Sequence, residues 1–218
     1  MLRKQFPNSN RTKRLGGMLM EAQGQMRPAM ACYDEVLAAE PANLHAVKRQ
    51  VALCRSRGRN AEAAKKLTVH LDTFCGDTEA WLLLCEIYIS QQLYRRAQFC
   101  MEELLLLNPM SYLYHLRYAE LLYTVASSDR GSHEQFLTAR KYFAHALELK
   151  PGCARALYGL MLCCSVLTAA KAKICSPSAT QDLLELVERQ LLEAYAADPQ
   201  SRGMLKLVNG MLKKARSS

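Results

Sequence analysis

The chain contains 218 residues with a formal net charge of +9, and 50% of its residues are hydrophobic, 7% aromatic and 22% charged. This composition is typical of a globular protein with a sizeable core, and it excludes a wholly disordered, collagen-like or low-complexity chain. No apolar run approaches the roughly 18 residues that a membrane-spanning helix needs, and no apolar stretch follows the basic start as in a secretory signal.

The positive charge is concentrated in the first third of the chain. Residues 1–70 hold 13 basic and 5 acidic residues, whereas residues 71–218 hold 16 and 15. Such a surface is compatible with nucleic acid, anionic lipid or an acidic partner, and equally with an ordinary solvated face.

The chain begins inside a repeating pattern. Pro7 occupies the position that ends the second helix of a repeat, although only six residues precede it. Because a solenoid end normally carries a polar cap, we expect either that the chain is an N-terminally shortened version of a longer protein or that a partner covers the open end.

Three kinds of residue recur at one period of 34. Each repeat has an alanine at one fixed position. A large apolar or aromatic residue lies four positions after this alanine, and a small or mid-sized residue lies twelve positions before it. The three sets are Ala29, Ala63 and Ala97; Tyr33, Leu67 and Met101; and Gly17, Val51 and Cys85. A 34-residue period with these markers is typical of tetratricopeptide repeats, in which two antiparallel helices pack closely.

The third repeat has the clearest pattern. It predicts a first helix over Thr78–Gln91 and a second over Tyr94–Leu107, with Ala97 buried. The apolar residues of the first helix fall at the i, i+3, i+4, i+7 spacing of one helical face, which favours core packing over a ligand site. Asn108-Pro109 ends the second helix, because proline disfavours helical geometry in the residue before it.

The whole chain is therefore predicted to be an all-α, right-handed superhelical solenoid of tetratricopeptide repeats. The repeats are expected at about 10–43, 44–77, 78–111, 112–153 and 154–201, with a C-terminal capping helix at about 203–215. The fourth repeat is longer by 8 residues, which we assign to a polar loop at 126–133. The fifth is longer by 14, which we assign to a loop at 171–180 before a long helix over Gln181–Ala197.

Catalytic and metal-binding motifs are not found. The five histidines lack metal-ligand spacing, no glycine-rich phosphate loop or nucleophile motif occurs, and the nine cysteines form no CxxC pair. We interpret the cysteines as buried, reduced thiols of a cytosolic or nuclear protein. The sequence predicts no enzyme, no cofactor and no metal site.

Binding of a partner by the face of the first helices is the default expectation for such a solenoid. Positions 2, 5, 9 and 12 of each first helix are expected to face inward, which makes the groove basic early and mixed later. The candidate partner-binding residues are Arg11, Arg14, Lys48, Arg55, Glu79, Glu86, Glu120 and Tyr123. The asparagines of a chaperone-tail clamp are missing from the corresponding positions, and the basic first third lacks the aromatic platforms of a single-strand nucleic-acid site.

Several stretches that the repeat itself does not require resemble one family. They are Gln5–Leu15 with Gly17-Met18 and Glu21-Ala22, Gly76–Trp81, Phe99–Leu104 with Asn108-Pro109, Tyr118–Glu120, Ala139–Ala144 and Arg155–Leu157. In these stretches the chain resembles subunit 2 of the endoplasmic reticulum membrane protein complex, over about residues 3–160. The segment from Ala169 to Ser218 is less recognisable.

The resemblance implies a cytosolic, non-catalytic scaffold that is peripheral to the endoplasmic reticulum membrane. Its implied partners are the cytosolic ends of membrane subunits and a soluble subunit, with no nucleic acid, in a complex that inserts tail-anchored and multi-pass proteins. The alternative is a general tetratricopeptide adaptor in another assembly or chaperone pathway.

Overall fold

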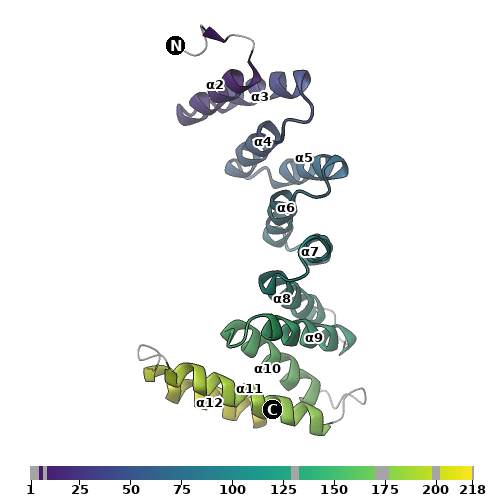
Figure 1. The fold of residues 1–218 in the computed structure, drawn as a ribbon, viewed down its shortest axis with the longest axis vertical. Helices are drawn as coiled ribbons and strands as arrows, with labels where there is room; N and C mark the ends of the chain where they lie inside the picture. Colours follow the sequence, from purple (N-terminus) through teal and green to yellow (C-terminus); the bar gives the residue numbers. More distant parts are fainter. Residues whose placement is uncertain (1–4, 7–8, 129–132, 170–176, 198–201, 218) are drawn as a thin grey trace. The chain divides into compact units, whose positions relative to one another are not determined.

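A computed structural model of the protein describes residues 5–6, 9–128, 133–169, 177–197 and 202–217. Within these ranges the secondary structure is entirely helical, which confirms the all-α prediction. The helices form two compact units, residues 1–92 and 93–218, and each unit is described by itself. Figure 1 shows the order of the helices along the chain.

The first unit contains two complete helical hairpins and the first helix of a third. The helices are α2 (Asn10–Ala22), α3 (Met26–Ala39), α4 (Leu44–Ser56), α5 (Asn60–Thr73) and α6 (Thr78–Ser90). Each of them packs against the next along the chain. The predicted first helix of the third repeat, Thr78–Gln91, is confirmed to within one residue.

The 34-residue markers lie in the core of this unit. Ala29, Tyr33, Ala63 and Leu67 have no exposed surface. Gly17 marks a close approach of α2 and α3, because a Cβ atom built on it would lie 2.7 Å from Tyr33 Cε1. The predicted role of the small residues, to let paired helices approach, is therefore confirmed.

The turns of this unit repeat with the same period. Gly24, Gly58 and Gln92 follow α2, α4 and α6 at intervals of 34 residues, with φ values of 77°, 71° and 60°. Positive φ costs glycine nothing, whereas a residue with a Cβ atom is strained there. Gln92 thus occupies a position that the two earlier repeats give to glycine.

The second unit continues the pattern with longer helices. They are α7 (Tyr94–Leu107), α8 (Tyr112–Ser128), α9 (His133–Leu149), α10 (Ala154–Ala169), α11 (Pro177–Ala197), the short 3-10 helix η1 (Arg202–Met204) and α12 (Leu205–Ser217). Successive α-helices again pack against each other, and α12 contacts both α10 and α11. Ala97 is fully buried, as predicted, and α7 has the predicted bounds.

The predicted loop at 126–133 is wrong at both ends. α8 continues to Ser128 and α9 starts at His133, while residues 129–132 lie outside the described residues. α8 and α9 have 17 residues each, compared with 13 in α6 and 14 in α7, so longer helices take up most of the insertion. The reason is that Ala126 extends the apolar face of α8 and is buried against Phe136 and Leu167.

The second predicted loop, at 171–180, is also too long. α11 begins at Pro177 and Thr180 is buried in it, while residues 170–176 are outside the described residues. Proline is favoured in the first turn of a helix, because the backbone N–H that it lacks would have no partner within the helix there. The predicted capping helix is found at Leu205–Ser217, two residues later than expected.

The predicted burial of the cysteines is found for most of the described ones, with one exception. Cys54, Cys85, Cys100, Cys163 and Cys164 are buried, and Cys32 and Cys153 are partly buried, but Cys75 is exposed. Cys175 lies outside the described residues.

The predicted division into five repeats of one solenoid stays a prediction, although the observed helix pairs fall within the expected ranges.

Candidate partner-binding face

Asparagine and aspartate side chains fix the starts of two first helices. Asn43 Oδ1 accepts a hydrogen bond from the Ala46 N–H at 3.1 Å, and Asp77 Oδ1 accepts one from the Ala80 N–H at the same distance. These are N-caps, which satisfy backbone donors that a helix start leaves unpaired. They set the register of α4 and α6 and thereby the positions of Lys48 and Glu79.

Charged side chains join the first helix of one repeat to the first helix of the next. Lys48 Nζ lies 2.5 Å from Glu79 Oε2, and Arg55 Nη2 lies 3.4 Å from Glu86 Oε2. In the second unit, Arg155 donates three hydrogen bonds to the Glu120 carboxylate, the shortest at 2.7 Å. We call these pairs, together with Glu21–Arg49, the inter-repeat ion pairs.

Five of the eight predicted partner-binding residues belong to these pairs. Lys48, Arg55, Glu79, Glu86 and Glu120 therefore already have counter-charges from their own chain. Lys48 and Arg55, which were expected to make the early part of the groove basic, are thus paired with carboxylates of the protein itself.

The predicted set omits Arg155, which pairs with Glu120, and both members of the Glu21–Arg49 pair. Glu21, Arg49 and Arg155 lie 28 to 35 residues from their partners. A search for opposite charges about one repeat apart, on the same face of first helices, would have found them.

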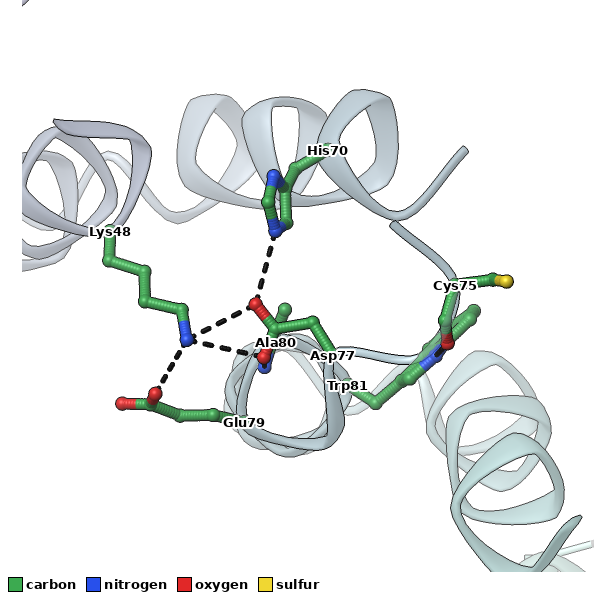
Figure 2. A network of polar contacts seen from close by, with 7 residues as sticks. All are labelled: Lys48, His70, Cys75, Asp77, Glu79, Ala80 and Trp81. Carbon is green, nitrogen blue, oxygen red and sulfur yellow. Dashed lines mark hydrogen bonds and ion pairs between the residues drawn. The ribbon is translucent and has the colours of Figure 1, made fainter. Parts of the chain in front are cut away.

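A polar network ties α4, α5 and α6 together, as Figure 2 shows. The Asp77 carboxylate lies 3.1 Å from the Lys48 ammonium and 3.1 Å from Nε2 of the buried His70. Trp81 Nε1 donates to the Cys75 carbonyl oxygen at 2.8 Å, which closes the turn that leads into α6. Asp77 thus caps a helix and joins three helices at once.

The network shifts the pKa of both charged groups toward the charged form. Burial raises the pKa of Asp77, but hydrogen bonds from His70, the Ala80 N–H and Lys48 outweigh burial and leave it below its ordinary value. Burial lowers the pKa of Lys48, but its contacts with Glu79 and Asp77 leave it raised overall. The pair is therefore fully ionised near neutral pH.

A second charged cluster lies between α2, α3 and α4. Burial raises the pKa of Tyr33 to about 12, so its hydroxyl stays protonated and donates to Glu21 Oε1 at 2.5 Å. Arg49 donates to the same carboxylate. Glu21 therefore binds groups from α3 and α4, the two helices that follow α2 in the chain.

The remaining predicted residues differ from these pairs. Arg11 is exposed and Arg14 half-buried on α2, and neither has an ion pair among the described residues. Tyr123 packs edge-to-face on Phe136, with ring centroids 5.3 Å apart, so part of its ring belongs to the core. Arg11 and Arg14 are thus the predicted cations that have no ion pair among the described residues.

A hollow of about 650 Å³ lies on another surface of the first unit, between α3, α4 and α5. Its lining includes the apolar side chains Leu37, Val47 and Val69, with Lys65 and Lys66 beside them. Sequence reasoning did not anticipate it, because it depends on how three helices meet.

The described residues contain no cluster of three or more His, Cys, Asp or Glu side chains suited to a metal ion. Among the described helices, none is both long enough and apolar enough to cross a membrane.

Comparison with known proteins gives a consistent relationship. Residues 1–137 match the model of the EMC2 TPR-like repeat domain. The chain is 44% identical over 161 residues to ER membrane protein complex subunit 2 of Xenopus tropicalis, covering 74% of this chain and 52% of that protein. It is 29% identical over 214 residues to TPR repeat protein oca3 of Schizosaccharomyces pombe, covering 98% and 72%. The chain thus spans about half the length of the subunit 2 relatives that it matches.

Solved structures with low identity support the fold alone. The chain is similar to MamA, with a TM-score of 0.58 at 15% identity over 89% of this chain and 92% of MamA. It is similar to YrrB, described as a TPR protein with an unusual peptide-binding site, with a TM-score of 0.59 at 14% identity over 86% and 89%. Both likenesses confirm the tetratricopeptide solenoid.

Proposed function

Because this chain belongs to the EMC2 TPR-like repeat domain family, we propose that it acts as a non-catalytic scaffold subunit of the endoplasmic reticulum membrane protein complex. The observation that carries the proposal is the match of residues 1–137 together with the 44% identity to a subunit 2 relative. On this proposal the chain lies on the cytosolic side of the membrane, where it holds membrane subunits and a soluble subunit. Its contribution to the insertion of tail-anchored and multi-pass proteins is then to position those partners.

The arrangement of charges supports a scaffold role. The inter-repeat ion pairs neutralise most of the predicted partner-binding face and fix neighbouring first helices relative to each other within each unit. A face held in this way is pre-organised, which reduces the ordering cost of binding.

The contact with partners is proposed to include Arg11 and Arg14 on α2. No acidic residue lies between Arg3 and Glu21 in the sequence, and neither arginine has an ion pair among the described residues. An acidic segment of a partner subunit would complement this surface. Glu79 and Glu86 in the first unit, with their paired cations, are proposed as further partner contacts there. Glu120 and Tyr123 are proposed separately as partner contacts of the second unit.

Affinity purification from detergent-solubilised membranes tests the proposal. Recovery of membrane-complex subunits with the chain is expected, whereas recovery of chaperones or soluble machinery instead would favour an adaptor in another assembly. Recovery as a free monomer, with all partners present, would refute the scaffold role.

A charge-reversal pair tests the α2 contact. Replacing Arg11 and Arg14 by Glu should weaken co-purification, and the loss should shrink as salt rises because exposed charges are screened. The matched control replaces the exposed Arg57 and Lys65 by Glu, which changes the net charge equally. Equal effects of the two double variants at low salt would contradict a specific role for α2.

A further inference from the structure

The helix α12 has a buried apolar row and, beside it, an apolar row that the described residues leave exposed. Val208 and Leu212 are each 4% exposed where α12 packs against α10 and α11. Met204, just before the helix, and Leu207 and Met211 within it are 58%, 64% and 47% exposed. Because these three residues are spaced by three and four, they lie on one side of the helix and form an exposed apolar stripe.

The same segment is strongly basic. Residues 202–218 contain five basic and no acidic residues, whereas residues 93–201, the rest of the second unit, contain 11 basic and 11 acidic residues. Arg202 and Lys206 are exposed, and Arg202 Nε donates to the Ala196 carbonyl oxygen at 2.9 Å. The second unit therefore confines its excess positive charge to the segment with the uncovered apolar stripe.

We propose that α12 binds directly to an anionic lipid surface, with Met204, Leu207 and Met211 inserted at the level of the headgroups. A helix with an apolar stripe and a basic polar face lies in the membrane interface, and its binding depends on both buried apolar area and attraction to anionic lipids. This contact is independent of the proposed scaffold function, in which partners provide the membrane association.

The charges favour lipid over a second copy of the chain. Two α12 segments meeting through their stripes would bring ten positive charges together without an acidic residue from the segment itself. An anionic bilayer offers an apolar interior and negative headgroups together, and it requires no matching side-chain pattern. The stripe complements such a surface, because two flexible methionines and a leucine lie beside exposed basic residues.

Vesicle co-sedimentation with the purified 218-residue chain tests the proposal. Binding to phosphatidylcholine vesicles that contain phosphatidylserine is expected, with little binding to pure phosphatidylcholine vesicles and a loss of binding as salt rises. Leu207→Glu should weaken binding by at least about tenfold, since it removes an exposed apolar side chain that the membrane would bury and adds a negative charge. Lys206→Glu should weaken it several-fold while leaving the stripe intact.

Leu106→Glu is the matched control, because Leu106 is 78% exposed on α7, outside the segment. It should bind vesicles like the wild type, and circular dichroism should show equal helicity for all variants. The proposal is overturned if the wild type fails to bind phosphatidylserine vesicles at low salt, or if Leu106→Glu loses as much binding as Leu207→Glu. It is equally overturned if light scattering shows a dimer that Leu207→Glu disrupts, without vesicle binding. Because the assay contains no partner subunit, its failure leaves the co-purification test unaffected.

Discussion

Two adjacent glycines in α2 have opposite surroundings. A Cβ atom on Gly17 would contact the ring of the buried Tyr33 at 2.7 Å, whereas a Cβ atom on Gly16 would have no neighbour within 4 Å. The Tyr33 ring is held by full burial and by its bond to Glu21, so it cannot turn aside cheaply.

We therefore expect Gly17→Ala to lower the melting temperature and Gly16→Ala to raise it. Alanine at Gly16 gains about 1 kcal/mol of helix propensity, which corresponds to about 2–4 °C for a chain of this size. At Gly17 the clash outweighs that gain. Thermal unfolding followed by circular dichroism measures both changes, and an increase for both variants would contradict the close approach of α2 and α3.

The turn at Gln92 gives a second prediction, in which introducing a glycine should stabilise the protein. Its φ of 60° is unfavourable for a residue with a Cβ atom, and the equivalent positions are Gly24 and Gly58. Gln92→Gly should stabilise the protein by about 1 kcal/mol, because it relieves this strain. Gly58→Gln, at the same turn one repeat earlier, should destabilise it by a similar amount in denaturant unfolding. No change in either variant would show that these turns relax freely.

Individual residues of the core were predictable because packing repeats. Ala29, Ala63 and Ala97 share one environment, so a single period in the sequence identifies all three. Positive φ at Gln92 was not predictable, since glutamine is not a residue that signals such a turn. Its position became evident only from the 34-residue interval to Gly58 and Gly24.

At the level of the helices, the junction of α5 and α6 depends on one side chain. Asp77 caps α6 and contacts His70 on α5 and Lys48 on α4. Its lowered pKa means that the folded state holds the carboxylate ionised more strongly than the unfolded chain does. The resulting stabilisation is present above the unfolded pKa, near 4, and is lost as the pH falls through the lower folded-state pKa.

Asp77→Asn separates the charge from the cap. Asparagine caps a helix about as well as aspartate, so the variant loses the ion pair and keeps the cap. We expect it to be less stable than the wild type by roughly 1–2 kcal/mol at pH 7, with the difference shrinking as the pH falls below the unfolded pKa and vanishing below the lowered folded-state pKa. Urea unfolding across this range provides the measurement. The control is Asp72→Asn, at an exposed position on α5, which should differ little in stability from the wild type at any pH in this range. If Asp77→Asn were less stable by the same amount at all pH values, the charge effect would be ruled out.

The helix bounds followed from the sequence better than the contacts between charged side chains. Helix α6 was predicted because its apolar residues keep helical spacing. The end of α7 was predicted because Asn108-Pro109 follows it. The bond between Arg155 and Glu120 was not, because long charged side chains tolerate many partners. Their pairing depends on how one first helix is set against the next. The ends of α8 and α11 were misjudged for a related reason: polar residues near a helix end are common to loops and helices.

Considered along its whole length, the chain should respond to damage locally. In a repeat protein each hairpin contacts mainly its neighbours, so stability is close to a sum of local terms. The closely packed Gly159, against Phe143 in the second unit, offers a counterpart to Gly17 in the first.

Hydrogen exchange should therefore distinguish the two units. Gly17→Ala should speed exchange of the amides in α2 and α3 and leave those in α9 and α10 near their wild-type rates, while Gly159→Ala should do the reverse. Mass spectrometry of peptic fragments resolves these segments. Uniform acceleration across the chain in either variant would indicate a single cooperative unit in place of local stability.

The inter-repeat ion pairs also restrict how such a protein can change over evolution. Each pair links positions one repeat apart, so reversing the charge of Lys48 places a like charge beside Glu79 and Asp77. A compensating change at a neighbouring repeat restores the attraction. Substitutions at Glu120 and Arg155 should thus be inherited together among relatives, at a separation of 35 residues. Repeats joined in this way cannot be exchanged or duplicated freely, because each first helix carries charges matched to one specific neighbour.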